Sequence, residues 1–161
     1  MKTLLLLLFP FVSMSGSKEL TWDDFKGTPK PDHTAYVSMS IGFEYTDLQD
    51  GHYIFEDAAV TIHPESSYSN SHDPYILNHE NGHLKIAQIQ CNYINNLSHI
   101  HHIHYTKEGF EAMKREIIRR WDRMDSLFDE QTQHSINREM QAKWDIKIAR
   151  MLNNPKYAEI Y

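Results

Sequence analysis

Alternating apolar and polar positions predict two strands in the first half of the chain. Every second residue of positions 37–45 is apolar: Val37, Met39, Ile41, Phe43 and Tyr45. This period of two is typical of a strand with one buried face. The pair Asp50-Gly51 then predicts a hairpin turn, and residues 53–63 are expected to return as the second strand. The polar residues 64–71 are expected to form a loop.

The second half of the chain repeats its apolar residues every three or four positions, which predicts three helices. The first begins at Asp73-Pro74, an N-cap followed by proline, and continues through Ile94. Residues 98–104 connect it to a second helix over residues 110–128. After a break at residues 129–133, a third helix is expected over residues 136–152. We therefore expect an α+β fold, with a small antiparallel sheet followed by three helices in one domain.

The first predicted helix carries the sequence His79-Glu80-Asn81-Gly82-His83, an H-E-x-x-H pattern. Residues four apart share a helix face, so His79 and His83 can present two imidazole nitrogens to one zinc ion. Glu80 lies about 100° round the helix from His79, where it can act as a general base on a water molecule at the metal. This arrangement is typical of zinc peptidases. We predict one Zn2+ per chain and hydrolysis of peptide bonds by zinc-activated water.

Two small residues of this helix, Gly82 and Cys91, lead to further structural predictions. Gly82 in the middle of a helix costs about 1 kcal/mol relative to alanine, so we expect another backbone or a substrate to pass close to it. Cys91 is the only cysteine, which excludes a disulfide within the chain. A buried, inert thiol is expected for Cys91 in preference to a metal ligand.

Two histidines do not complete a catalytic zinc site, which normally has three protein ligands. Ile86 and Ile89 exclude the longer pattern that continues with glycine and a third histidine, so the third ligand must come from further along the chain. A solvated turn is a simpler interpretation of the histidine-rich connector than a metal-scavenging tract. The candidate third ligands are His99, His101, His102 and His104 of the connector, Glu116 and Asp122 of the second helix, and Asp129 and His134 at the break.

Three blocks of sequence carry a resemblance. They are residues 20–27 (Leu-Thr-Trp-Asp-Asp-Phe-Lys-Gly), residues 77–87 around the H-E-x-G-H centre, and residues 128–134 (Phe-Asp-x-x-Thr-x-His) with Gln141 and Trp144. Together they resemble a bacterial family described as predicted secreted zinc-dependent proteases and classed as a domain of unknown function. The resemblance spans residues 20–144, and Ser135 stands where many members have glycine.

The resemblance implies a zincin-like peptidase whose site includes the block at residues 129–134. Imidazole is the commoner zinc donor, so we expect His134 to be the third ligand. Asp129 is the alternative, either as the third ligand itself or as a carboxylate that orients another ligand.

The N-terminus predicts export. Residues 1–15 resemble a secretory signal peptide, with Lys2, an apolar stretch at residues 4–12 and small residues at the cleavage site. Cleavage at residue 17 fits as well. The apolar stretch is shorter than the about 20 residues that cross a bilayer, and no cysteine follows it to carry a lipid anchor. We expect a secreted or periplasmic protein with no membrane span, whose zincin-like domain covers residues 18–161.

Charge and pattern also bear on partners. The net charge is −6, and the sequence has no basic stripe that could bind phosphate groups. Both features argue against binding of nucleic acid. The expected partner is a peptide or protein substrate. Residues 60–62, just before the metal helix, could pair with an extended substrate, or they form an ordinary core strand. The sequence leaves the oligomeric state open. The alternative function is a non-catalytic metal-binding or interaction domain with a zincin-like shell.

Overall fold

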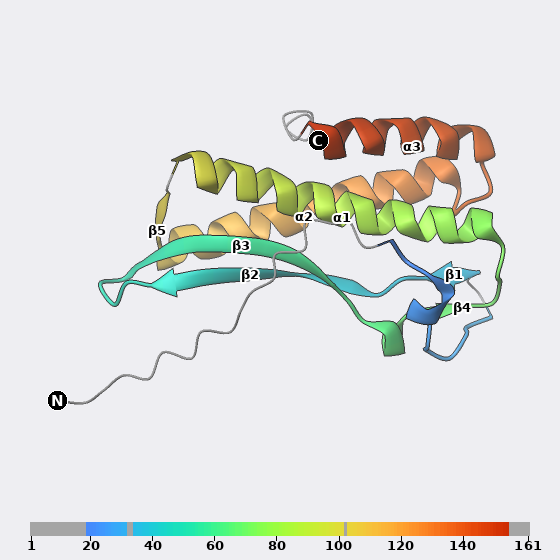
Figure 1. Ribbon diagram of the computed structural model, residues 1–161, viewed down its shortest axis with the longest axis horizontal. Helices are drawn as coiled ribbons and strands as arrows, with labels where there is room; N and C mark the ends of the chain where they lie inside the picture. Colours follow the sequence, from blue (N-terminus) through green and yellow to red (C-terminus); the bar gives the residue numbers. More distant parts are fainter. Residues whose placement is uncertain (1–18, 32–33, 102, 155–161) are drawn as a thin grey trace.

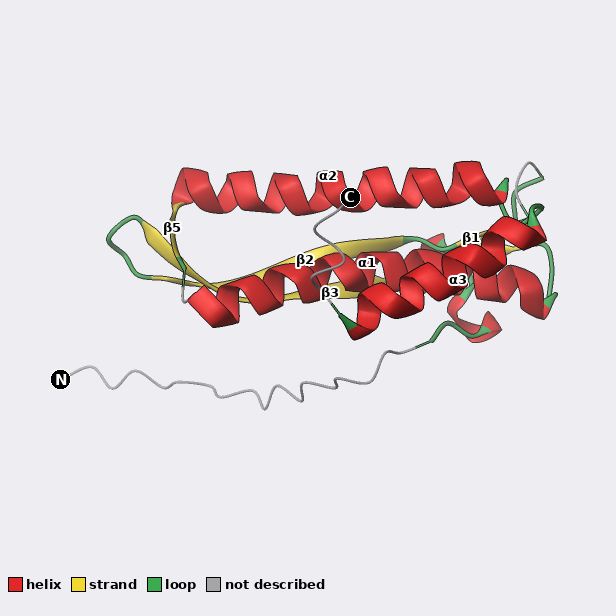
Figure 2. Ribbon diagram, turned by 90° about the horizontal axis from the view of Figure 1, so that it is seen from above, coloured by secondary structure: helices red, strands yellow, loops and turns green. Residues whose placement is uncertain are grey.

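The computed structural model describes residues 19–31, 34–101 and 103–154. Three helices lie over one face of a small antiparallel sheet (Figures 1 and 2). The predicted α+β class is therefore confirmed, whereas the predicted signal peptide lies outside the described residues. The elements in chain order are a 3-10 turn at Trp22–Asp24, β1 (Ala35–Tyr36), β2 (Met39–Asp47), β3 (His52–Ile62), a 3-10 turn at Pro64–Ser66, β4 (Tyr68–Ser69), α1 (Pro74–His101), β5 (His104–Thr106), α2 (Lys107–Thr132) and α3 (Arg138–Asn153).

The sheet is built on the predicted hairpin. β2 and β3 pair antiparallel from Met39 opposite Ile62 to Asp47 opposite Tyr53, with a shift in register after Glu44. β5 adds to the first residues of β3, so the order is β2-β3-β5 and β2 is an edge strand. β1 and β4 form a separate two-residue pair. Strands this short carry no sequence period, which is why β1, β4 and β5 were not predicted.

Two predicted boundaries are wrong. The connector at residues 98–104 is helical as far as His101, and β5 begins at His104, since α1 has no glycine or proline after Gly82 that would end it earlier. The break at residues 129–133 also lies later, because α2 continues through Thr132. It ends where Gln133, His134 and Ser135 take left-handed φ angles of 52°, 49° and 73°. Asp129 therefore belongs to the last turns of a helix and not to a loop.

The core explains why the motif is buried. One side of α1 packs on the sheet and on the first half of α2, through residues such as Cys91, Ile94 and Phe110. Its other side packs on α2 and α3 through Ile86 and Ile89. Cys91 is buried as expected, and burial raises the pKa of its thiol to about 12. No helix in the described part of the chain has the length and apolar character to cross a membrane.

Candidate metal site

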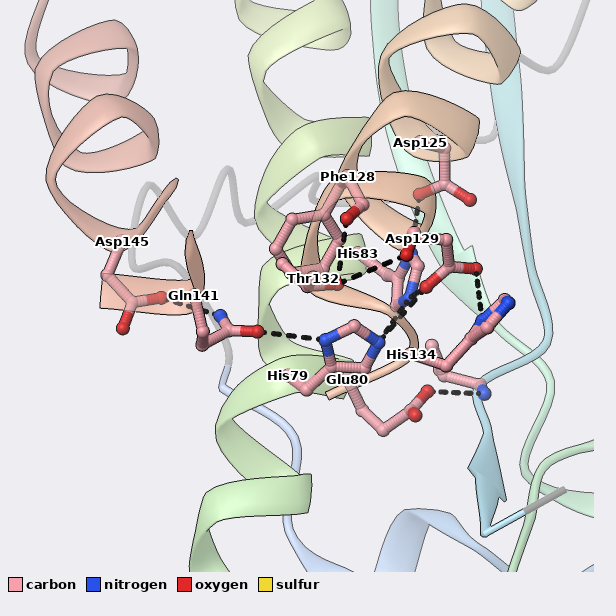
Figure 3. A network of polar contacts seen from close by, with 11 residues as sticks. His79, Glu80, His83, Asp125, Phe128, Asp129, Thr132, His134, Gln141 and Asp145 are labelled. Carbon is pink, nitrogen blue, oxygen red and sulfur yellow. Dashed lines mark hydrogen bonds and ion pairs between the residues drawn. The ribbon is translucent and has the colours of Figure 1, made fainter. Parts of the chain in front are cut away.

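Three side chains from two helices converge on one point between α1 and α2 (Figure 3). His79 and His83 lie one helical turn apart on α1, and their Nε2 atoms are 3.2 Å from each other. The Oδ1 atom of Asp129, on α2, lies 3.1 Å from each of these nitrogens. Among the described residues, this is the one group of three metal-ligating side chains whose donor atoms lie so close together.

Hydrogen bonds on the outer side of each ring determine which nitrogen faces inward. The side-chain NH2 group of Gln141 donates a hydrogen bond to Asp145 at 2.8 Å. The side-chain oxygen of Gln141 therefore faces His79 and accepts a hydrogen bond from its Nδ1–H at 2.9 Å. The carboxylate of Asp125 can only accept a hydrogen bond, so the Nδ1–H of His83 donates to it at 2.7 Å. In the neutral rings both Nε2 atoms therefore carry lone pairs. Both lone pairs point at the Asp129 carboxylate.

Three acceptor atoms that face one another repel unless a cation or a proton lies among them. Four ligands at about 2.0–2.1 Å from a tetrahedral metal ion are roughly 3.3 Å apart, close to the observed 3.1–3.2 Å. The three residues therefore fit a metal ion. Without one, a proton takes this place: burial lowers the pKa of His83, but hydrogen bonds to Asp125 and Asp129 raise it to about 10.

Two residues of the motif, Glu80 and Asn81, hold other parts of the chain against α1. Glu80 is buried, and its Oε2 accepts the backbone N–H of Val37 at 2.9 Å. Asn81 accepts the backbone N–H of Leu20 at 2.7 Å through its side-chain oxygen. Burial raises the pKa of Glu80, against the opposing effect of His83 and His79. A carboxyl group whose pKa is raised in this way, one residue from a metal ligand, is suited to accepting and returning a proton.

Gly82 leaves room for an aromatic ring. A Cβ atom at this position would lie 2.6 Å from Cζ of Phe128. The Phe128 ring stacks on His79 with centroids 4.7 Å apart and meets His83 edge-on at 5.0 Å. The expectation that a backbone or a substrate passes here is wrong, because the side chain of Phe128 fills the space. This ring holds both histidines in place.

The structure places Asp129 between the two motif histidines and His134. The Oδ2 atom of Asp129 lies 3.3 Å from Nδ1 of His134, a side chain that is 73 % exposed. His134 is thus close to the site but outside the group of three converging atoms. Of the other candidate ligands, Glu116 pairs with Arg119 at 2.8 Å and His104 lies in β5 opposite Ile54. The side chains of His99, His101 and His102 lie outside the described part of the chain.

Sequence reasoning assigned no role to the residues around the ligands. Asp125 was missed because its spacing of four from Asp129 is also that of an ordinary solvated helix face. Gln141 and Phe128 belong to the blocks that carry the family resemblance, and that was the one signal for them. Gln141 is 62 residues from its partner His79, and Phe128 is 46 residues from Gly82. Such distant pairs leave no local pattern in the sequence.

Comparison of the chain with models of protein families, with curated proteins and with solved structures finds no match. The resemblance to the secreted zinc-protease family therefore stays a prediction. The metal-ligating geometry carries the functional argument.

Proposed function

We propose that this chain is a zinc-dependent peptidase in which His79, His83 and Asp129 bind the metal and Glu80 is the general base. The observation that carries the proposal is the meeting of two Nε2 atoms and one Oδ1 atom within 3.2 Å of each other. Two imidazoles suit zinc, whereas magnesium and calcium prefer oxygen ligands alone. Three protein ligands leave a fourth position open, as catalytic zinc sites require.

In this proposal Glu80 transfers the proton during hydrolysis. Zinc held by these ligands supplies a Lewis acid that polarises a carbonyl oxygen and lowers the pKa of water to about 7. Val37 holds only the Oε2 atom of Glu80, so Oε1 is available to take a proton from the water. The water oxygen attacks the carbonyl carbon of the peptide. As the carbon–nitrogen bond breaks, Glu80 returns the proton to the leaving amine nitrogen.

The proposed fold class, location and substrate follow from the resemblance to the zinc-protease family. A strand hairpin, a metal helix and a helical C-terminal half support a zincin-like arrangement, and the N-terminal pattern supports a secreted or periplasmic location. The substrate in this proposal is a peptide or an unfolded protein.

Asp129 replaces His134 as third ligand in this proposal, because its oxygen faces both imidazoles while His134 contacts the other side of the carboxylate. Asp129→Ala should lower zinc affinity by 100-fold or more. His134→Ala should lower it by about tenfold, the smaller effect of removing a group that orients a ligand. Zinc titration against a fluorescent chelator measures both, and the reverse order of effects would assign the third ligand to His134.

Glu80→Gln tests the catalytic assignment. The variant should bind one zinc per chain and hydrolyse labelled, reduced casein at least 1,000-fold more slowly than the wild type, since the amide cannot take the proton. Glu44→Gln, an exposed carboxylate on the outer face of β2, is the matched control and should keep full activity. Wild-type turnover in Glu80→Gln would refute the mechanism.

One observation favours the alternative, a non-catalytic metal-binding or interaction domain. The hydrogen bond from Val37 gives Glu80 a structural task that needs no catalysis. In that case the wild type binds zinc tightly but cleaves no member of a peptide library. In addition, Glu80→Gln then lowers stability without any change in turnover.

A further inference from the structure

A small groove lies between α1 and α3, which run side by side in the same direction (Figures 1 and 2). Its volume is about 180 Å³, below the roughly 300–1,000 Å³ of pockets that hold drug-sized ligands. None of its lining residues is a proposed zinc ligand or the proposed general base. The lining of this α1–α3 groove consists of Asn78, Gly82 and Lys85 of α1 with Asp145, Ile148, Ala149 and Leu152 of α3.

The two ends of the α1–α3 groove carry opposite charges. Asn78 donates a hydrogen bond to the carboxylate of Asp145 at 3.1 Å, so these two residues lie at the same end. Lys85 is seven residues further along α1, and Leu152 is seven residues further along α3. Because the helices are parallel, this second end lies about 10.5 Å from the first. The groove thus has an anionic end, a cationic end and, between them, apolar side chains of α3.

The charged groups at both ends are available to a ligand. Asp145 is exposed and accepts hydrogen bonds from the neutral amides of Asn78 and Gln141, and no ion pair among the described residues includes it. Lys85 pairs with Glu19 at 3.0 Å, but the Glu19 side chain is 66 % exposed. Such a surface pair contributes little to stability. A ligand carboxylate can therefore replace Glu19, and a ligand ammonium can neutralise Asp145.

Asp145 also connects the α1–α3 groove to the proposed metal site (Figure 3). Its Oδ1 atom accepts a hydrogen bond from the side-chain NH2 of Gln141 at 2.8 Å, and the oxygen of that amide accepts the Nδ1–H of His79 at 2.9 Å. An ammonium group at Asp145 competes with Gln141 for the carboxylate. The amide then holds His79 less firmly, and loss of such support lowers metal affinity.

We propose that the α1–α3 groove is a regulatory site for short peptides with free amino and carboxyl ends. The ammonium group binds Asp145, the carboxylate binds Lys85, and an aliphatic side chain packs on the floor. Three extended residues at about 3.3 Å each match the groove length of about 10.5 Å. Peptides of this class are products of the proposed peptidase, so the source of the ligand rests on the proposed function, whereas binding does not require it. Product bound here weakens zinc binding.

Isothermal titration calorimetry with the tripeptide Ala-Leu-Ala tests binding in zinc-loaded Glu80→Gln protein, where no turnover occurs. Asp145→Asn in this background should weaken binding about tenfold or more, because asparagine keeps an oxygen for Gln141 but loses the charge. N-acetylation of the tripeptide should have the same effect. Asp122→Asn, at an exposed carboxylate of α2, is the matched control and should bind normally. Equal affinity in the two variants overturns the proposal.

Three more variants place the tripeptide in the groove. Ala149→Phe should fill the groove and abolish binding, whereas Arg150→Phe, at an exposed residue outside the lining, should bind normally. Glu19→Gln frees Lys85 and should tighten binding about threefold. Circular dichroism checks that each variant folds. Binding that survives in a folded Ala149→Phe protein places the tripeptide elsewhere and overturns the proposal.

Zinc affinity in saturating tripeptide tests the regulation. Competition with a fluorescent chelator should show about fivefold weaker zinc binding in the Glu80→Gln protein, and zinc should weaken tripeptide binding by the same factor. Ala149→Phe in the same background corrects for zinc bound by the tripeptide itself and should show no change. An equal zinc affinity with and without tripeptide overturns the regulatory site.

These results are separate from a test of the proposed function. Groove binding that lowers zinc affinity, in a protein whose wild type hydrolyses no peptide, supports the site and refutes the peptidase. Hydrolysis of casein by the wild type, with no tripeptide binding in the groove, supports the peptidase and overturns the site.

Discussion

Gly82→Ala is the substitution for which the structure and helix propensity give opposite answers. Propensity alone predicts a gain of about 1 kcal/mol for alanine in a helix interior. The structure places the new Cβ 2.6 Å from Cζ and 2.9 Å from Cε1 of Phe128, about 1 Å closer than carbon atoms normally approach. Phe128 cannot retreat, because it is fully buried with Trp144 behind it at 5.5 Å between centroids.

Overpacking of this kind costs about 1–3 kcal/mol. We therefore expect Gly82→Ala to lower the free energy of unfolding by about 1 kcal/mol after the propensity gain is subtracted. Zinc affinity should fall as well, since the displaced ring is stacked on His79. Urea unfolding followed by circular dichroism, with and without zinc, measures both effects.

Two companion variants make this prediction falsifiable. Asn96→Ala, on the exposed side of the same helix, should gain a few tenths of a kcal/mol from propensity alone. Adding Phe128→Leu to Gly82→Ala should relieve the overlap and recover part of the lost zinc affinity. If Gly82→Ala is as stable as Asn96→Ala and binds zinc normally, Phe128 does not position the histidines.

The remaining three predictions concern protonation and backbone strain. Burial lowers the pKa of His83, but its hydrogen bonds to Asp125 and Asp129 raise it to about 10 in the metal-free protein, so zinc uptake at pH 7 should release about one proton. Calorimetry in two buffers of different ionisation enthalpy measures this release, and a count of zero would refute it. Because folding raises the pKa of His83, this residue stabilises the folded protein fully below about pH 6.5, and the stabilisation is lost as the pH rises toward 10. The metal-free protein should therefore unfold at a lower urea concentration as the pH rises through that window. Ser135→Gly should stabilise the protein by about 0.5–1 kcal/mol in urea unfolding, because Ser135 has a φ of 73° that glycine adopts without strain; a loss of stability would refute that account.

Local sequence patterns predicted most of the fold. The hairpin of β2 and β3, the three helices and the pair of histidines on one face of α1 all follow from periods that repeat within a dozen residues. These periods are visible because each element must bury one face. They fail at element ends, where α1 continued to His101 and α2 to Thr132.

The amino-acid sequence by itself determined that His79 and His83 share a helix face beside Glu80, because four residues make about one helical turn. Only the tertiary structure decided which group faces them. Asp129 and His134 are five residues apart and both lie near a helix end, so no local pattern separates them. The extra turn of α2 aims Asp129 at the histidines, and the left-handed residues 133–135 leave His134 exposed. The contacts that arrange the site join residues 42 to 62 positions apart, and the packing of α1 against α2 and α3 is what brings them together.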